Sequence, residues 1–394
     1  MKKHFANNLS KLLIYTLAVI SILFLTQCSA IINKNYLKKS LELGTDFILN
    51  NQKPQGNFNY MYDWLEQEFI QGDNQVRQAG AAWGISLIHQ YTLEKDVLES
   101  LEKALQFFDN ISKVVDNKRF IVYPKVSSGS LGTVALVALA YIDLLRVADK
   151  SLTEEKTALY RSRLDEYLNF LVAARQENGM WHNYYNLQTG KSYGRSSPYS
   201  DGESLLALIK TAKYLDRPEF LDVIYESAQV CYKNNVFEAL LKDPDSNTTK
   251  GYYQWGSMAY YEMSTTDWPN VKKYGDYVVQ LADWMIDIHE TLRRTRNTAY
   301  AYEGIICAYK IAKDRKDRAH VKKFKYVIKT GLTKLTSWQV GHPLANDFIR
   351  TQFTGDDDYA LGGVQNHRKE APLRIDVAQH QMHAVILALK YVFK

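Results

Sequence analysis

Residues 129–139 read Gly-Ser-Leu-Gly-Thr-Val-Ala-Leu-Val-Ala-Leu, a run of small and apolar side chains. A helix that is apolar around its whole circumference has to be buried on all sides. Further segments share this character, at 78–87, 201–208, 255–261, 298–305 and 379–389. The sequence therefore predicts six inner helices that pack against one another.

Segments with one strongly charged face alternate with these inner helices along the chain. Residues 94–103 and 321–329 are examples, and they are typical of amphipathic helices on the outside of a domain. Six inner and six outer helices in alternation predict an all-α chain of six helical hairpins. We expect the twelve helices at 35–51, 75–92, 95–110, 130–148, 153–176, 201–215, 218–234, 252–265, 269–291, 297–313, 317–338 and 375–393.

The connections between these helices are asymmetric. Links from an inner to an outer helix are short, as at 314–317, whereas most links in the other direction are long, as at 177–200 and 339–374. The long loops therefore gather at the N-terminal ends of the inner helices. Free N–H groups and positive helix-dipole ends lie at such a face, and functional groups accumulate on loops above a rigid scaffold.

This alternation resembles the (α/α)6 toroid of the six-hairpin glycosidase superfamily, which includes unsaturated glucuronyl hydrolases, related polysaccharide-degrading enzymes and N-acylglucosamine 2-epimerases. The resemblance covers residues 35–394 as one domain, and it implies a carbohydrate ligand. It rests on the order of helices and loops, so it transfers no catalytic residue. Terpene and lanthionine cyclases share the toroid, but their Asp-rich and zinc-binding motifs are not evident here.

The N-terminus has the pattern of an export signal. Three lysines precede the apolar run 12–25, whose fourteen residues suit a signal segment better than a membrane-spanning helix of about 20. Residues 25–29 resemble a bacterial lipobox, which predicts removal of 1–27, lipidation of Cys28 and a short linker over 28–34. Cleavage after Ala30 and a retained segment are the alternatives. We expect an exported protein, lipid-anchored in a bacterial cell envelope.

Composition excludes several classes of function. The net charge of +6 falls to +3 without residues 1–27, which argues against nucleic-acid binding. Three cysteines cannot form a disulfide framework, and Cys231 and Cys307 lack the spacing of zinc ligands. No motif for a cofactor is present, so we expect neither a cofactor nor a metal. The oligomeric state is open.

The densest group of chemically active side chains begins the last inner helix. Asp376, His380 and His383 are spaced i, i+4 and i+7, so they lie on one helix face, with Gln379 beside them. A polar stripe on a buried helix has to line a cavity or form hydrogen bonds. The first interpretation is that His or Asp of this stripe acts as an acid, a base or a sugar anchor. The second is a structural network of hydrogen bonds. Metal ligation is the least favoured interpretation, because ligands on a single helix seldom all reach one ion.

A second group, Asp201 and Glu203, lies in the segment Ser197–Ser204 at the start of the third inner helix. Glycosidases need one protonated carboxyl group and a second group that activates water or attacks the sugar. We expect Asp201 to be the acid, with Asp376, Glu303 or Asp73 across the ring as its partner. The alternative is a helix cap in which Ser200 and Glu203 form a capping box.

Basic and aromatic residues complete the expected sugar site at the loop face. An arginine near a helix N-terminus is electrostatically unfavourable, so it needs an anionic partner, which is either a structural Asp or an acidic sugar. Aromatic rings suit the C–H faces of sugars, although many Tyr side chains only pack loops together. The expected substrate-binding residues are Arg77, Gln78, Trp83, Trp181, Tyr199, Glu203, Trp255, Arg296, Asn297, Tyr300, Arg374 and Gln379.

These observations predict a glycoside hydrolase that uses carboxylate acid–base catalysis on an oligo- or polysaccharide, with Asp201 and Asp376 as the preferred pair. Two alternatives stay open. A sugar epimerase or lyase would use His380 or His383 as a proton-transfer base, with no carboxylate pair needed. A glycan-binding or scaffold lipoprotein would need no catalytic group at all.

Overall fold

The computed structural model describes residues 31–394. The signal segment and the lipidation site expected at Cys28 lie outside the described residues. Within residues 31–394, no helix is long and apolar enough to cross a membrane.

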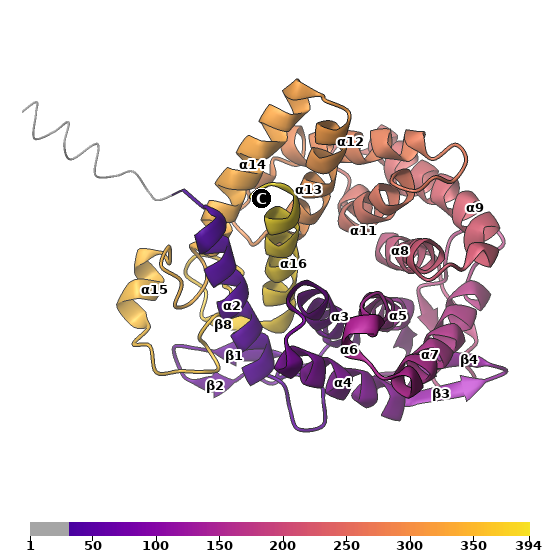
Figure 1. Ribbon diagram of the computed structural model, residues 1–394, viewed down its shortest axis with the longest axis horizontal. Helices are drawn as coiled ribbons and strands as arrows, with labels where there is room; N and C mark the ends of the chain where they lie inside the picture. The colour runs from indigo at the N-terminus through magenta and orange to yellow at the C-terminus, as the bar shows by residue number, and fades with distance from the viewer. Residues whose placement is uncertain (1–30) are drawn as a thin grey trace, which may run out of the picture.

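Six inner helices form a closed ring, and each packs against the next around the circle (Figure 1). Six outer helices surround that ring, which confirms the prediction of an all-α toroid. The inner helices are α3 (Gln75–Thr92), α5 (Leu131–Leu145), α8 (Pro198–Tyr214), α11 (Asn247–Ser264), α13 (Ala299–Asp314) and α16 (Ile375–Tyr391). The outer helices are α2 (Lys34–Asn50), α4 (Lys95–Asn110), α7 (Glu154–Ala173), α9 (Leu221–Tyr232), α12 (Lys272–Asp287) and α14 (Arg318–Thr336).

The two ends of the described chain close the toroid. Each of the first five inner helices packs against the outer helix that follows it in sequence. The last inner helix, α16, instead packs against α2, the first outer helix, as the indigo and yellow ribbons of Figure 1 show. The sixth hairpin is therefore assembled from opposite ends of the sequence.

Small residues let the inner helices approach one another closely. Every residue of α5 is buried. A Cβ atom at Gly84 of α3 would lie 2.4 Å from Cγ of Gln379 on α16, so this contact between α3 and α16 needs a residue without a side chain. The outer helices bury only one stripe; in α4 it includes Val97, Leu101 and Phe108.

The long loops carry short strands that tie neighbouring hairpins together. One sheet has the order β2–β1–β8 and joins the loop 51–74 to the loop 337–374, with Tyr62 opposite Leu373. Another has the order β5–β6–β7, with Gly129 opposite Tyr185. The strands are β1 (Met61–Asp63), β2 (Glu68–Phe69), β3 (Ser112–Val115), β4 (Lys118–Ile121), β5 (Gly129–Ser130), β6 (Tyr184–Tyr185), β7 (Ser192–Tyr193) and β8 (Pro372–Arg374), and β3 pairs with β4.

Two inner helices begin earlier than predicted. Helix α8 starts at Pro198 and α11 at Asn247, instead of 201 and 252. Proline suits the first turn of a helix because its missing N–H is not needed there. The alternative reading, a capping box at Ser200, is therefore wrong: Ser200 lies within the helix, and its hydroxyl donates to Oδ1 of Asn183 at 2.9 Å. The links also contain the short helices α6 (Ala148–Ser151), α10 (Glu238–Lys242) and α15 (Asp347–Gln352).

Candidate functional site

A cavity of about 420 Å³ opens at the N-terminal ends of the inner helices. We call it the mouth cavity. Its size falls in the range of small-molecule sites. Most of the residues expected to bind or transform a sugar line it: Arg77, Tyr199, Glu203, Trp255, Asn297, Tyr300, Arg374, Asp376, Gln379 and His380.

Two guanidinium groups bind Asp376 at the edge of the mouth cavity. Nε and Nη2 of Arg374 donate to its two carboxylate oxygens at 3.0 and 2.7 Å, and Nε of Arg77 lies 3.3 Å from Oδ2. The anionic partner expected for Arg77 is therefore the Asp376 carboxylate of the protein itself. With both oxygens bound by cations, Asp376 anchors the rim of the cavity, and it is poorly suited to give up a proton as a catalytic acid.

His380 is the side chain of the polar stripe that is best placed for proton transfer. Its Nδ1 lies 2.9 Å from Oε1 of Glu303 on the neighbouring helix α13, and Glu303 is completely buried. This contact fixes the imidazole ring and leaves Nε2 available to a ligand in the mouth cavity. Oε2 of Glu303 lies 3.4 Å from Nδ1 of His383. One carboxylate therefore joins both histidines.

The electrostatics of this group follow from the close contacts. Burial by itself would raise the pKa of Glu303, but the two adjacent imidazoles outweigh it and lower that pKa. Burial by itself would lower the pKa of His380, but the Glu303 carboxylate outweighs it and raises that pKa. His380 is therefore a stronger base than a free imidazole. Glu303 does not line the cavity itself; it orients and polarises His380.

His383 does not reach the mouth cavity. It is buried one turn further along α16, where it lines a smaller cavity of about 70 Å³ at the C-terminal ends of the inner helices. We call this second space the base cavity. The expectation that Asp376, His380 and His383 share one site is therefore correct only for the first two residues.

Glu203 is the unpaired carboxyl group of the mouth cavity. Its side chain is buried, and Oε2 has no hydrogen-bond partner among residues 31–394. Burial raises the pKa of Glu203 to about 8, so the carboxyl group is protonated at neutral pH. Gly132 of α5 makes room for it, because a Cβ atom there would lie 2.3 Å from Oε2. Glu203 can thus donate a hydrogen bond or a proton.

Asp201 does not face the mouth, contrary to the expectation that it is the catalytic acid. It is completely buried; Oδ1 accepts the backbone N–H of Trp181 at 2.9 Å and Oδ2 accepts Nδ2 of Asn235 at 3.0 Å. Asp201 therefore ties the 177–200 loop to the turn after α9. Trp181 is likewise structural, since its buried indole donates to the carbonyl of Leu171.

Other predicted site residues also have structural contacts. Gln78 binds both backbone groups of Phe58, and it donates to Asp73, which is expected as a partner of the acid and is also bound by Tyr123. Trp83 lines the base cavity. Arg296 is mostly exposed and lies 3.5 Å from Glu370, so it does not line the mouth.

Three polar lining residues were missed by sequence reasoning: Lys250, Gln254 and Asn366. Lys250 belongs to the first turn of α11, but the predicted start at 252 left it in a loop. The available signal was the cap at Ser246, whose hydroxyl accepts the N–H of Thr248. Across residues 31–394, no three His, Cys, Asp or Glu side chains are grouped to hold a metal ion.

Comparisons with known proteins give matches only at the level of structure. No family model and no curated protein sequence matches the chain. A D-mannose isomerase is 12% identical, with a TM-score of 0.62 over 91% of this chain and 98% of that one. The GH76 α-mannanase of Bacteroides thetaiotaomicron is 10% identical, with a TM-score of 0.60 over 91% and 95%.

A cellobiose 2-epimerase from Bacillus thermoamylovorans is 11% identical, with a TM-score of 0.61 over 89% of this chain and 98% of that one. At these identities the likeness concerns the fold, and activity has to be argued from the site. The chain therefore has the (α/α)6 toroid fold that sugar isomerases, sugar epimerases and mannanases share.

Proposed function

We propose that this protein is a carbohydrate-active enzyme that transfers a proton next to the carbonyl group of an open-chain sugar, as an isomerase or epimerase does. The observation that carries the proposal is the His380–Glu303 pair at a mouth cavity large enough for a sugar. A base oriented by a buried carboxylate is the arrangement that general acid–base catalysis needs. The solved isomerase and epimerases of the same fold support it.

The mouth cavity offers a role for each polar group in such a reaction. Nε2 of His380 takes the proton from C2, the C–H electrons form a double bond between C1 and C2, and the carbonyl π electrons move to the oxygen to give an enediolate. Protonated Glu203 donates a hydrogen bond to that oxygen, and the guanidinium groups of Arg77 and Arg374 stabilise its negative charge. In an isomerisation the proton returns to C1 while the hydroxyl proton on O2 moves to O1, so the carbonyl group ends at C2. In an epimerisation the proton returns to the opposite face of C2 and the carbonyl group re-forms at C1.

The charge of the mouth cavity favours a sugar with an acidic substituent. Three basic side chains line it, those of Arg77, Lys250 and Arg374. Among residues 31–394 only two carboxyl groups line it, those of Asp376 and Glu203, and Glu203 is protonated. Lys250 has no ion-pair partner within residues 31–394 and is left to bind a ligand. A carboxylate or phosphate on the sugar would compensate this excess of positive charge.

Glycoside hydrolysis is the second candidate, because Glu203 can act as a neutral acid. Of the other carboxylates, Asp201 is engaged by the backbone, Asp376 by two arginines and Glu303 by histidine. A hydrolase would need Asp376 to activate water despite its ion pairs. Proton transfer by His380 needs no such rearrangement, so it is the function that the contacts favour.

The experiment follows C2 by proton NMR in D2O while the protein is incubated with mannose, glucose, cellobiose, glucuronate and sugar phosphates. Exchange of the C2 proton and formation of an isomer support the proposal. The His380→Asn variant should lose this activity by about 100-fold or more. His182→Asn, at a half-buried loop position that does not line the mouth cavity, serves as the matched control and should retain it.

Hydrolysis is tested in parallel by release of reducing ends from α-1,6-manno-oligosaccharides and from uronate-containing oligosaccharides. Activity that survives His380→Asn but is lost in Glu203→Gln would overturn the proposal in favour of a hydrolase. Binding of sugars without turnover of any of them would identify a glycan-binding protein instead.

The pH dependence of the isomerase activity gives an independent check on the pair. Because Glu303 raises the pKa of His380, the neutral base forms only above that raised pKa, and the rate should rise through it. Glu303→Gln removes the charge, so the rising limb should move to lower pH. If the rising part of the pH–rate profile lies at the same pH in Glu303→Gln as in the wild-type protein, His380 is not the base.

A further inference from the structure

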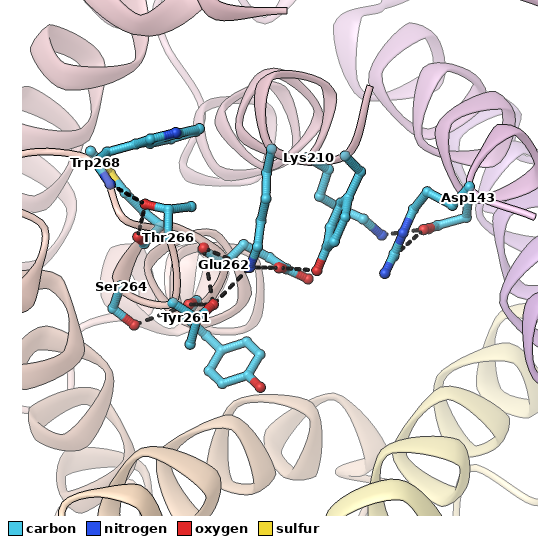
Figure 2. A network of polar contacts seen from close by, with 12 residues as sticks. Asp143, Lys210, Tyr261, Glu262, Ser264, Thr266 and Trp268 are labelled. Atoms are coloured by element: carbon cyan, nitrogen blue, oxygen red, sulfur yellow. Dashed lines mark hydrogen bonds and ion pairs between the residues drawn. The ribbon is translucent and has the colours of Figure 1, made fainter. Parts of the chain in front are cut away.

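The base cavity, at the opposite end of the ring from the mouth cavity, is enclosed by a network of buried charges. Asp143 at the end of α5 accepts Nζ of Lys210 at 2.5 Å, Nη1 of Arg146 at 2.8 Å and the indole N–H of Trp83 at 2.8 Å. Figure 2 shows Lys210 of α8 and Asp143 of the neighbouring helix α5 pointing toward one another, with Glu262 nearby.

Glu262 of α11 is the second carboxylate of this network. It accepts Nζ of Lys213 at 2.7 Å and the hydroxyl of Tyr214 at 2.6 Å. Burial acts to raise the pKa of Glu262, but Lys213 and Lys210 outweigh it and lower that pKa. Both carboxylates of the base cavity are therefore ionised and already paired.

The basic side chains outnumber these carboxylates. Arg146, Lys210, Lys213 and Lys390 face Asp143 and Glu262, so two positive charges are uncompensated. Lys390 of α16 has no carboxylate within ion-pair distance in residues 31–394; its Nζ lies 5.7 Å from the centre of the Tyr91 ring. Lys210 is buried, and Arg146, Lys213 and Lys390 are half-buried, so excess positive charge is costly here because these side chains are only partly solvated.

Loss of a proton cannot relieve all of this charge. Arginine stays protonated in proteins, and Lys210 and Lys213 are held by carboxylates. Burial together with Arg146 lowers the pKa of Lys390, which no carboxylate in residues 31–394 approaches within ion-pair distance. Burial also lowers the pKa of Lys210, although the Asp143 carboxylate acts against this. One positive charge would still remain after Lys390 lost its proton.

We propose that the base cavity binds a small inorganic anion, a halide or a tetrahedral oxyanion, between Lys390, Lys210 and Arg146. The three side chains line one cavity of about 70 Å³, which is room for such an ion and too little for a sugar. A bound anion joins the C-terminal ends of α5, α8 and α16 and stabilises the closed ring at its base. This site is separate from the mouth cavity and does not depend on the proposed reaction.

The test measures the thermal unfolding temperature of the full-length protein. Sodium gluconate is replaced stepwise by sodium bromide at constant ionic strength. In the wild-type protein we expect a rise on the order of 3 °C between millimolar and 0.1 M bromide. Lys390→Met should abolish the rise. Lys250→Met, which removes an unpaired lysine from the mouth cavity, should retain it. Sodium phosphate in place of bromide distinguishes an oxyanion site from a halide site.

Three results would overturn the proposal: no rise in the wild-type protein, a rise that persists in Lys390→Met, or one that is lost only in Lys250→Met, which would place the anion in the mouth. If Lys390→Met does not fold, crystals of the wild-type protein soaked in bromide test whether an anion binds in the base cavity. An anomalous bromide peak among Lys390, Lys210 and Arg146 supports the site, as does phosphate density there in phosphate-soaked crystals. The absence of both refutes it.

Discussion

Replacing Glu203 with glutamine should make the protein more stable at alkaline pH and remove one component of its pH dependence. Glutamine has the shape of the protonated carboxyl group and does not ionise. The pKa of Glu203 is about 8 in the folded protein, raised by burial from its ordinary value of 4.5. The unfolded chain therefore loses this proton at a lower pH than the folded protein does.

The sign and size of the effect follow from proton linkage. Between pH 4.5 and 8 the folded state binds more protons than the unfolded state, so the free energy of unfolding falls as the pH rises. Each pH unit in that interval removes about 1.4 kcal/mol. Ionisation of Glu203 should therefore lower the free energy of unfolding of the wild-type protein by roughly 4 kcal/mol between pH 5 and pH 8. The Glu203→Gln variant has no ionisable group at this position and should not show this decrease.

The assay is urea unfolding of both proteins at half-unit steps between about pH 5 and pH 9. The difference between the two free energies of unfolding isolates Glu203, because all other groups titrate in both proteins. Glu68→Gln, at an exposed position in β2, is the matched control and should follow the wild-type curve. Parallel curves for wild type and Glu203→Gln would refute the assignment of Glu203 as a buried, protonated acid.

Further predictions concern the ring and the N-terminus. Gly132→Ala should destabilise the protein by about 1–3 kcal/mol in urea unfolding, because the new Cβ would lie 2.3 Å from Oε2 of Glu203; an unchanged midpoint would contradict that packing. Lys210→Met should cost roughly 3–5 kcal/mol, since it breaks a buried pair with Asp143, and a cost below 1 kcal/mol would show that the pair is solvated. Cys28→Ala should abolish incorporation of radiolabelled palmitate in a bacterial host; equal labelling of the wild-type protein and the variant would rule out lipidation at Cys28.

The inner helices were predictable because burial on all sides selects small and apolar residues within each helix itself. The positions of Asp376 and His380 on one face were predictable for a similar reason, since helical spacing is a local property. The partner of His380 was not, because Glu303 is 77 residues away in sequence and meets it only when α13 packs against α16.

The different surroundings of Asp201 and Glu203 could not be predicted from the local sequence. They are two residues apart on α8, so they project from different sides of the helix. One side faces the 177–200 loop and the turn after α9, whereas the other faces the mouth cavity. The orientation of α8 in the ring decides which carboxyl group is satisfied by the protein and which is left for a ligand.

The sequence by itself determined the alternation of buried and amphipathic helices, and with it the toroid and the face that carries the long loops. These properties depend on hydrophobic patterning along each segment. Only the tertiary structure decided which polar groups meet: it placed Lys250 in the mouth cavity, paired Asp376 with two arginines, and left Lys390 without a carboxylate at the base cavity. The physical reason is that charges and hydrogen bonds act over a few ångströms, between helices whose neighbours are set by the closure of the ring.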